Sequence, residues 1–467
     1  MRGTPSAHLG VLWRGAILLA AHSLLPLAQV IDARVGDGSD SELATVARRS
    51  ALAGGATPSG TDAAPDPCLP PMGLTMPTLI GPRTFHPAVR SAREVQRFEY
   101  DDRHIFRFWR YFSLLDVPPT SRLASEGRRE FWVFARNGQE RHSRIRPRTE
   151  LFVLPTARGA LVNRSHRAAK SLPVHRGEGI NFGATLSADG ASVLAAAGLV
   201  NHQVHHGRVE AVPYQNGTAI LSAAAPGRAL ADRHRVAWRR TSRFLADDLR
   251  RMGCHENRQG FAACNTDSKF SLVAHRGQVL VYARANISPE PGTGRFVQVT
   301  RARSPAGPWS AFDLVRIPGY DAAANNVYLG VFNVNPVDPD TVVGLFAMSG
   351  APKDELTRPW GAIRLAVSCD GVRFSRAETL ATSFQAREGR ATDHPVDGIV
   401  HDGDDVLLFL HTNVPGVRRS FTRPVPRRRR GTEAPPALRP AILSLAIGVD
   451  EFRALTARLK EGLPGCG

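Results

Sequence analysis

The sequence predicts an all-β fold, and two observations carry that prediction. From about residue 68 to the end, short β-type runs alternate with Gly-containing turns, while long amphipathic helical stretches are almost absent. The main candidate for a short helix is "ADDLRRM", residues 246–252. The second observation is an internal repeat, and repeats of this length are typical of arrays such as propellers.

Four units of the repeat share a strand, a turn and a second strand. They begin at Asn181, Asp267, Asn326 and His394. Their turns fall at Asp189-Gly190, at Arg276-Gly277, near Pro339 and at Asp402-Gly403. Similar spacing of strand entry and turn indicates one supersecondary unit used several times.

Third strands follow two of these units and end alike. In "RFVQVTRARSPAGPWSAF", Ser304 is followed by a turn at Gly307 and then Trp309. In "GAIRLAVSCDGVRFSRA", Ser368 is followed by a turn at Asp370-Gly371 and then Phe374. We interpret both as hairpins from a third strand to a fourth.

An earlier unit fits in "HIFRFWRYFSLLD" and "EGRREFWVFARNG", so that five units of about four strands are expected. We therefore predict a five-bladed β-propeller over residues 68–467. Its ring would close with the first and last strands coming from the two ends of the chain. A large β-sandwich or two stacked β-domains is the alternative fold.

Before the propeller, residues 1–33 are predicted to be a signal peptide, because Arg2 and Arg14 precede the apolar run 15–28. That run is shorter than the roughly 20 residues of a membrane span, so no stable membrane insertion is expected after signal removal. A Golgi anchor is the alternative. Residues 34–67 are predicted to be a disordered linker.

The expected location is the secretory pathway or the cell exterior. Three glycosylation sequons, at Asn163, Asn216 and Asn286, are consistent with this route. Connectivity of the five cysteines cannot be deduced from sequence. As working pairs we expect Cys254 with Cys264 and Cys68 with Cys466, which leaves Cys369 free.

The net charge of +18 does not by itself indicate nucleic acid, because only four of the 60 basic residues are lysines. The arginines are scattered, and the dense run at Arg427–Arg430 is interpreted as a solvated loop. We expect no nucleic-acid partner; a polyanion-binding protein is a third hypothesis. The histidines in "NHQVHHG" (201–207) lack an acidic partner nearby, so no metal is expected, and no cofactor signature is visible.

Four segments resemble the five-bladed propeller glycosidase superfamily of arabinanases, β-xylosidases, invertases and levansucrases. They are "NTDSKFSLVAHRGQVLVYARAN", "RFVQVTRARSPAGPWSAF", "SCDGVRFS" and "DHPVDGIV". The resemblance covers roughly residues 175–455, and the hairpins are also similar to the Asp-box of sialidases. It implies a glycoside hydrolase acting on an oligo- or polysaccharide. A non-catalytic propeller that binds glycans or proteins is the alternative function.

The superfamily uses three acidic residues around a central channel. Asp267 opens an inner strand and matches the first position, which implies the base or nucleophile. The next inner strand opens with Asn325-Asn326, and the following one with Asp393 and Asp397 instead of a glutamate. The resemblance therefore leaves the general acid unassigned.

Glycosidic hydrolysis needs two carboxyl groups with separate roles, one protonated and one ionised. The candidate catalytic residues are Asp267, Asp397 and Asp393. Each also has a structural interpretation, as a cap or partner of Arg284, a bulge acceptor beside Gly398, and a turn residue. The candidate substrate-binding residues are Arg284, Asn326, Arg390, His394 and Glu256, with Glu256 an alternative acid.

Overall fold

The computed structural model describes part of the chain. The described residues are 92–99, 109–124, 127–137, 148–154, 170–171, 178–205, 208–224, 238–255, 269–287, 294–320, 326–349, 360–386, 390–391, 393–412, 414 and 441–466. All of them belong to the compact unit Pro65–Gly467, and a second unit spans Met1–Ala64. The predicted signal peptide and linker lie outside the described residues. Among these residues no helix is both long and apolar enough to cross a membrane.

The described strands form four sheets. The first is β6 (Glu178–Leu186), β7 (Ser192–His205), β8 (Arg208–Ala224) and β9 (Arg239–Leu245), and the second is β10 (Ser271–His275), β11 (Gln278–Asn286), β12 (Arg295–Ala302) and β13 (Asp313–Leu314). The third is β14 (Asn326–Val334), β15 (Val342–Ser349), β16 (Trp360–Ser368), β17 (Glu378–Ala386) and β18 (Arg390–Ala391).

The fourth sheet has eight strands, in the order β1-β21-β20-β19-β2-β3-β4-β5. Their bounds are β1 Arg93–Glu99, β21 Ala441–Gly448, β20 Asp405–Thr412, β19 His394–Asp402, β2 Trp109–Val117, β3 Glu130–Asn137, β4 Arg148–Leu154 and β5 Lys170–Ser171. Its neighbours are antiparallel, except that β19 runs parallel to β2 and pairs with it only at Asp397↔Ser113.

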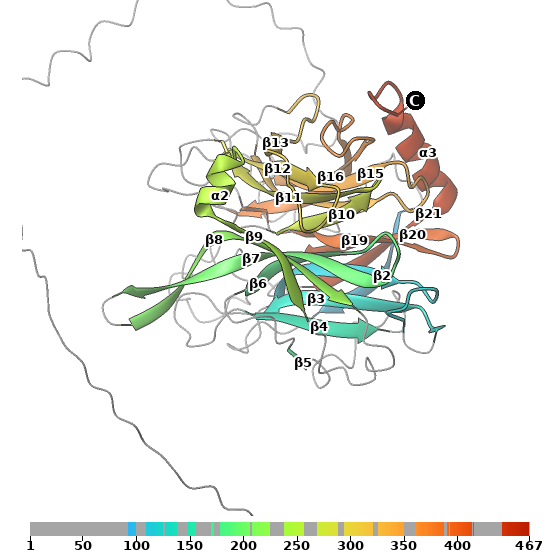
Figure 1. Ribbon diagram of the computed structural model, residues 1–467. Helices are drawn as coiled ribbons and strands as arrows, with labels where there is room; N and C mark the ends of the chain where they lie inside the picture. The colour runs from blue at the N-terminus through green and yellow to red at the C-terminus, as the bar shows by residue number, and fades with distance from the viewer. Residues whose placement is uncertain are drawn as a thin grey trace, which may run out of the picture. The chain divides into compact units, whose positions relative to one another are not determined.

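The first strands of the repeating units contact one another in a closed ring. β2 contacts β6, β6 contacts β10, β10 contacts β14, β14 contacts β19, and β19 returns to β2. In Figure 1 the β10 and β14 sheets lie on one side and β2–β9 on the other, with β19 and β20 between them. This is an all-β propeller. The prediction of five separate blades is not confirmed, because the β19–β2 pair joins two runs of strands and leaves four sheets.

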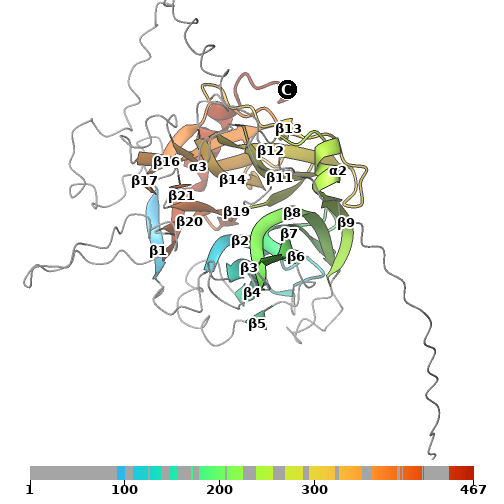
Figure 2. The same cartoon turned by 90° about the vertical axis from the view of Figure 1, so that its left-hand side faces the viewer.

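The predicted closure of the ring by the two ends of the chain is confirmed. β1 pairs antiparallel with β21, and Figure 2 shows the blue β1 beside the red strands. Asp405 on β20, whose side chain is 8% exposed, accepts from Arg93 on β1 at 2.7 Å. Hydrogen bonds and this ion pair hold the closure.

The predicted disulfide between Cys68 and Cys466 is wrong, and so is the prediction that Cys369 is free. Cys466 bonds to Cys369, with the two Cα atoms 5.4 Å apart. The physical reason is that the chain after β21 returns over the end of β16. Cys254 is also disulfide-bonded, and its partner lies outside the described residues.

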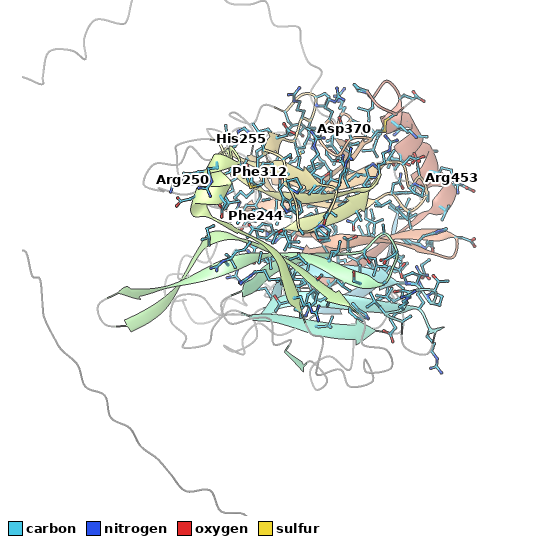
Figure 3. All side chains as sticks on the ribbon, viewed as in Figure 1. Phe244, Arg250, His255, Phe312, Asp370 and Arg453 are labelled. Carbon is cyan, nitrogen blue, oxygen red and sulfur yellow. A yellow bond between two sulfur atoms is a disulfide. The ribbon has the colours of Figure 1, made fainter. Side chains whose placement is uncertain are left out.

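Two helices accompany the sheets. The predicted short helix is present as α2 (Ala246–Arg251), beside which Phe244 and Phe312 pack in one core cluster (Figure 3). The sequence analysis missed α3 (Val449–Lys460). Its buried residues are Phe452, Leu455, Thr456 and Leu459, which follow the i, i+3, i+4, i+7 spacing of an amphipathic helix.

The hydrophobic core lies between neighbouring sheets. Tyr282 on β11 stacks on Phe332 on β14, with centroids 3.7 Å apart. Phe134 on β3 stacks on Phe182 on β6 at 4.9 Å. Large aromatic side chains of this kind contribute much of the buried apolar area of a core. The sheets therefore pack face to face around the ring.

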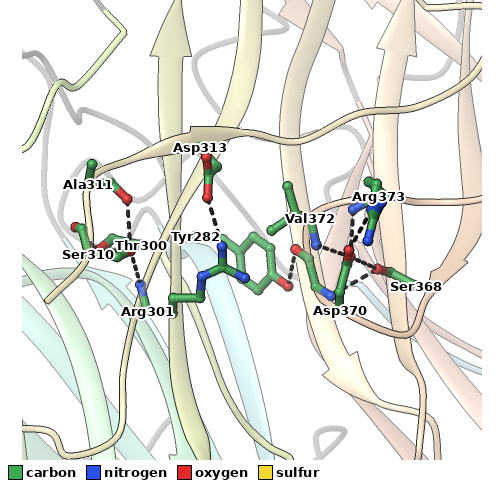
Figure 4. A network of polar contacts seen from close by, with 11 residues as sticks. Tyr282, Thr300, Arg301, Ser310, Ala311, Asp313, Ser368, Asp370, Val372 and Arg373 are labelled. Atoms are coloured by element: carbon green, nitrogen blue, oxygen red, sulfur yellow. Dashed lines mark hydrogen bonds and ion pairs between the residues drawn. The ribbon is translucent and has the colours of Figure 1, made fainter. Parts of the chain in front are cut away.

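The predicted hairpin at Ser368 is confirmed (Figure 4). Asp370 accepts from the backbone N–H groups of Val372 and Arg373, both at 2.8 Å, and pairs with the Arg373 guanidinium at 2.7 Å. Ser375 Oγ accepts from the Val367 N–H on the strand before the turn. Burial raises the pKa of Asp370, but these hydrogen bonds together lower it by more than burial raises it. The net shift of the pKa is therefore downward.

In the hairpin at Ser304, a serine hydroxyl again accepts from a backbone N–H on the strand before the turn. Ser310 Oγ accepts from the Arg301 N–H, as Ser375 does from Val367 in the other copy. The Ser368 hairpin is also linked to the neighbouring sheet, since the Tyr282 hydroxyl on β11 donates to the Gly371 carbonyl at 2.8 Å. This hairpin thus joins its own sheet to the sheet that contains β11.

Disulfide mapping tests the described connectivity. Proteolysis without reduction, followed by mass spectrometry, is expected to release one disulfide-linked peptide that joins Cys369 to Cys466. The separation of their Cα atoms lies within the range that a disulfide spans. Reduction should abolish this peptide. A Cys68–Cys466 peptide, or alkylation of Cys369 before reduction, would contradict the structure.

Candidate functional site

Irregular pairing near the start of the inner strands re-aims several side chains. The register shifts between Arg110 and Ser113 in β2, between Ile180 and Gly183 in β6, and between Val327 and Leu329 in β14. These intervals contain Tyr111, Asn181 and Tyr328. Such bulges commonly stand beside functional sites, where they redirect a side chain.

Two of the redirected residues have a backbone conformation that L-residues rarely adopt. Tyr111 has a φ of 53° and Asn181 a φ of 57°. Asparagine tolerates this region, whereas a bulky tyrosine there carries strain. Strain of this kind persists where surrounding contacts hold it, and it clusters at binding and catalytic sites.

His394, the first residue of β19, lies between the two redirected tyrosines. Its ring stacks on Tyr111 with centroids 5.9 Å apart and planes 12° apart, and lies 5.0 Å from the Tyr328 ring. His411 on β20 meets it edge-on at 6.5 Å. His394 is 2% exposed, so its ring acts as a buried spacer between two aromatic faces.

Three arginines complete what we call the inner-strand cluster. Its members are Tyr111, Arg136, Asn181, Arg284, Arg295, Asn326, Tyr328, His394 and His411. The Arg136 guanidinium lies 5.8 Å from the Tyr111 ring centroid, and those of Arg284 and Arg295 each lie 5.5 Å from Tyr328. These distances fall within the range of cation–π attraction.

Amide side chains order this cluster. Arg136 donates to Asn181 Oδ1 at 2.9 Å, and Asn326 Oδ1 accepts from the Arg295 backbone N–H at 3.1 Å. Both asparagines are fully buried. Their oxygens therefore fix the strands that carry the arginines.

A second group of polar side chains, which we call the axial hub, lies where the inner strands meet. It consists of Ser113, Lys269, Ser271 and Asp397, all buried. The Lys269 ammonium lies 3.1 Å from Asp397 Oδ2 and donates to Ser113 Oγ at 2.5 Å and to the Phe270 carbonyl at 2.7 Å. It also donates to the Phe182 carbonyl.

Ser271 extends the hub to the remaining strand. Its Oγ accepts from the Phe332 N–H at 2.9 Å, and its single proton can serve Asp397 Oδ1 at 2.8 Å or the Phe332 carbonyl at 2.9 Å. The hub therefore connects β2, β6, β14 and β19 to the segment that opens β10. Every strand of the inner ring contributes an atom to it.

Burial shifts the pKa values of Asp397 and Lys269 in opposite directions. Burial raises the pKa of Asp397, against the opposing effects of Lys269, Ser271 and Ser113. It lowers the pKa of Lys269, against the attraction of Asp397. Each charge is thus retained inside the protein because the other is present.

The approach of strands at the hub depends on glycine at two places. A Cβ atom at Gly183 would overlap the Phe270 carbonyl, and one at Gly398 would overlap the Leu114 carbonyl. Gly398 also has a φ of 132°, which side chains disfavour. The interpretation of Asp397 beside Gly398 as part of a bulge fits this geometry, because the register shifts between Pro395 and Ile399.

The structure brings three of the predicted substrate-binding residues together. Arg284 and His394 both lie against Tyr328, and Asn326 is tied to Arg295 beside the same ring. Asp397 does not belong to this group, since it is 3% exposed and its carboxylate pairs with Lys269 in the axial hub.

The structure describes the other predicted site residues only in part. Asp393, immediately before β19, is 2% exposed. Asp267 and Glu256 lie outside the described residues, and Arg390 is described only as part of β18. The convergence of the three aspartates therefore stays a prediction.

The sequence analysis missed Tyr111, Arg136, Asn181, Arg295 and Tyr328 in the cluster and Ser113, Lys269 and Ser271 in the hub. One signal was available for the hub, because Lys269 is one of only four lysines and follows Asp267 in an inner-strand opening. The tyrosines and Asn181 depend on bulges, which alternation of apolar residues does not reveal.

A groove of about 780 Å³ lies elsewhere, between α3 and the turn after β14. Its lining includes Val337, Asp338, Arg453, Thr456, Lys460 and Cys466. None of the predicted site residues lines it, and we place the candidate site at the inner-strand cluster because that is where aromatic and polar groups converge. Within the described ranges, no group of His, Cys, Asp or Glu is suited to hold a metal ion.

Comparisons with known proteins give only distant structural likenesses. No family model and no curated protein matches the chain. A protein of unknown function from Dyadobacter fermentans is 11% identical, with a TM-score of 0.42 over 77% of this chain and 99% of its own. A family 117 glycoside hydrolase of Zobellia galactanivorans is 8% identical, with a TM-score of 0.40 over 79% and 91%.

A GH93 α-L-arabinofuranosidase of Fusarium graminearum, solved with arabinobiose, is 9% identical, with a TM-score of 0.39 over 77% of this chain and 99% of its own. At these scores the likeness decides neither the fold nor the activity. The propeller fold is carried by the strand pairing and the closed inner ring.

Removal of the hub cation tests the energetic role of the buried pair. Lys269→Met is expected to lower the free energy of unfolding by about 3–5 kcal/mol, because Asp397 is left buried without its partner. Urea unfolding provides the measurement. Replacing both partners, as Lys269→Met with Asp397→Leu, should recover part of this loss.

Lys460→Met is the matched control. It removes a half-buried ion pair with Asp338 at 2.9 Å and is expected to cost about 1 kcal/mol or less. Equal destabilisation by Lys269→Met and Lys460→Met would contradict the role given to the hub.

Proposed function

We propose that this protein is a carbohydrate-active propeller whose ligand site is the inner-strand cluster. The observation that carries the proposal is the set of aromatic faces, guanidinium groups and amides around His394. Sites of this composition suit sugars, since aromatic faces offer apolar contact while a few polar groups fix orientation. The resemblance of the sequence to propeller glycosidases supports the same proposal.

We further propose that the propeller has five blades, with the eight-stranded sheet counted as two. Two antiparallel runs, β1-β21-β20-β19 and β2-β3-β4-β5, meet in that sheet at one parallel pair. Five first strands contact one another around the ring, which is the arrangement expected when each opens a blade. The hub accounts for the single pair, since Ser113 and Asp397 are held together there.

The reaction proposed is hydrolysis of a glycosidic bond. Asp267 is assigned as base or nucleophile and Asp393 as its partner, since both precede inner strands. One carboxylic acid would protonate the leaving oxygen while the other carboxylate acts at the anomeric carbon or on water. Asp397 is proposed as a positioning residue, since its burial and its bond to Lys269 keep it from substrate. Glu256 remains the candidate acid.

A non-catalytic glycan-binding propeller is the second candidate. The observation that favours it is the pairing of Asp397, one of the three predicted catalytic aspartates, with a buried lysine. Such a carboxylate stabilises the ring instead of reacting. Binding without turnover would then be the whole activity.

We also propose that the protein follows the secretory route. The N-terminal apolar run supports this, and so do the disulfide of Cys369 with Cys466 and the bonded state of Cys254, because such bonds persist in oxidising compartments. Its expected partner there is an oligo- or polysaccharide.

A glycan-panel hydrolysis assay tests the enzyme proposal. Wild-type protein is expected to cleave at least one oligosaccharide. Asp267→Asn and Asp393→Asn are each expected to lower turnover by about 10²–10⁴-fold, the usual contribution of an acid or base. Binding of the same oligosaccharide, measured by calorimetry, should persist in both variants.

Asp313→Asn is the control, because Asp313 lies half exposed on β13, paired with Arg301. Its turnover should match wild type. Turnover unaffected by Asp267→Asn would remove that assignment. Glycan binding without hydrolysis, in the wild type as well as in the variants, would favour the non-catalytic propeller. Absence of glycan binding would contradict both candidate functions.

A further inference from the structure

Two arginines of the inner-strand cluster are held by neutral acceptors. Arg136 donates to Asn181 Oδ1, and Arg284 donates to the Tyr328 carbonyl at 3.4 Å. Within the described part of the chain, no carboxylate lies at ion-pair distance from either guanidinium. The aromatic rings that these guanidinium groups contact belong to Tyr111 and Tyr328, which are uncharged.

Both arginines are only half-buried, yet Arg284 keeps part of its guanidinium inside. Its Nε atom is buried and makes no hydrogen bond to the described residues. A guanidinium carries five donors in a rigid fork, and burying one without an acceptor costs free energy. The arrangement is that of a donor set prepared for an acceptor that arrives from outside.

Aromatic neighbours hold these donors in place. Arg284 and Arg295 are both 5.5 Å from the Tyr328 ring, so two like charges stand close around one phenol. The ring attracts each of them, which offsets part of their mutual repulsion. An oxyanion beside Tyr328 would accept from the planar fork of Arg284 in bidentate fashion.

We propose that the saccharide bound by this propeller carries an anionic oxyanion group, a carboxylate or a sulfate, seated against Arg284 and Arg136. This inference rests on the proposed function and specifies the substrate class of the same site. His394, between Tyr111 and Tyr328, sets the spacing of the two arginine–tyrosine pairs. The sugar ring packs beside Tyr111, which is partly exposed, and the anionic group accepts from the guanidinium donors.

Calorimetric titration of the full chain with three size-matched tetrasaccharides tests this proposal. One is neutral, one contains uronate and one is sulfated. At least one anionic tetrasaccharide is expected to bind about tenfold or more tightly than the neutral one, since hydrogen bonds to charged partners contribute more. Whichever anionic sugar binds more tightly identifies the group as carboxylate or sulfate.

Arg284→Gln is expected to lower the affinity for the anionic tetrasaccharide about tenfold more than the affinity for the neutral one, so that the anionic preference is lost. Arg136→Gln provides a second variant if the first fails to fold. Arg250→Gln is the matched control, because it removes the same charge from an exposed ion pair on α2 (Figure 3) and should retain the preference.

Equal affinity for all three sugars would overturn the inference and leave the proposed function standing. A preference that survives both Arg284→Gln and Arg136→Gln would also overturn it. Acetate or sulfate ions serve as a further arm. If these ions bind as tightly as the anionic tetrasaccharides and no neutral sugar binds, the site is an anion site and the carbohydrate function fails.

Discussion

The buried ion pair between Lys269 and Asp397 is the contact on which the ring of inner strands depends. A lone charge in such a position would be costly, and the pair is stable only with both partners and the serines that bond to them. Lys269 donates to Ser113 and to two backbone carbonyls and forms an ion pair with Asp397, while Ser271 accepts from the Phe332 N–H. One polar group thereby ties together strands that are distant in sequence.

The same constraint shapes the candidate site. The strands that approach the hub contain bulges, and Gly183 and Gly398 permit close backbone contacts there. The bulges in turn direct Tyr111, Asn181 and Tyr328 toward the residues that surround His394. The strained φ of Tyr111 is therefore connected to the packing at the axis. Stability at the hub and the arrangement of aromatic and cationic groups are two consequences of one backbone geometry.

Sequence reasoning predicted most of the fold and only part of the site. Turns such as Asp402-Gly403 and the hairpin at Ser368 follow local chemistry, so the strand order could be predicted. The partner of Cys466 could not, because it depends on where the chain after α3 returns. The pairing of Asp397 with Lys269 was missed for a similar reason: a carboxylate at a strand opening looks the same whether it faces a channel or a buried ammonium.

Native-state hydrogen exchange tests most directly whether the hub joins the inner strands into one unit. The N–H groups of Phe332, bonded to Ser271, and of Phe270, bonded to the Asn181 carbonyl, report on two junctions of the ring. Both are expected to exchange only through global unfolding, with the same opening free energy and the same dependence on denaturant. Exchange of either one through a local opening of markedly lower free energy would contradict the account.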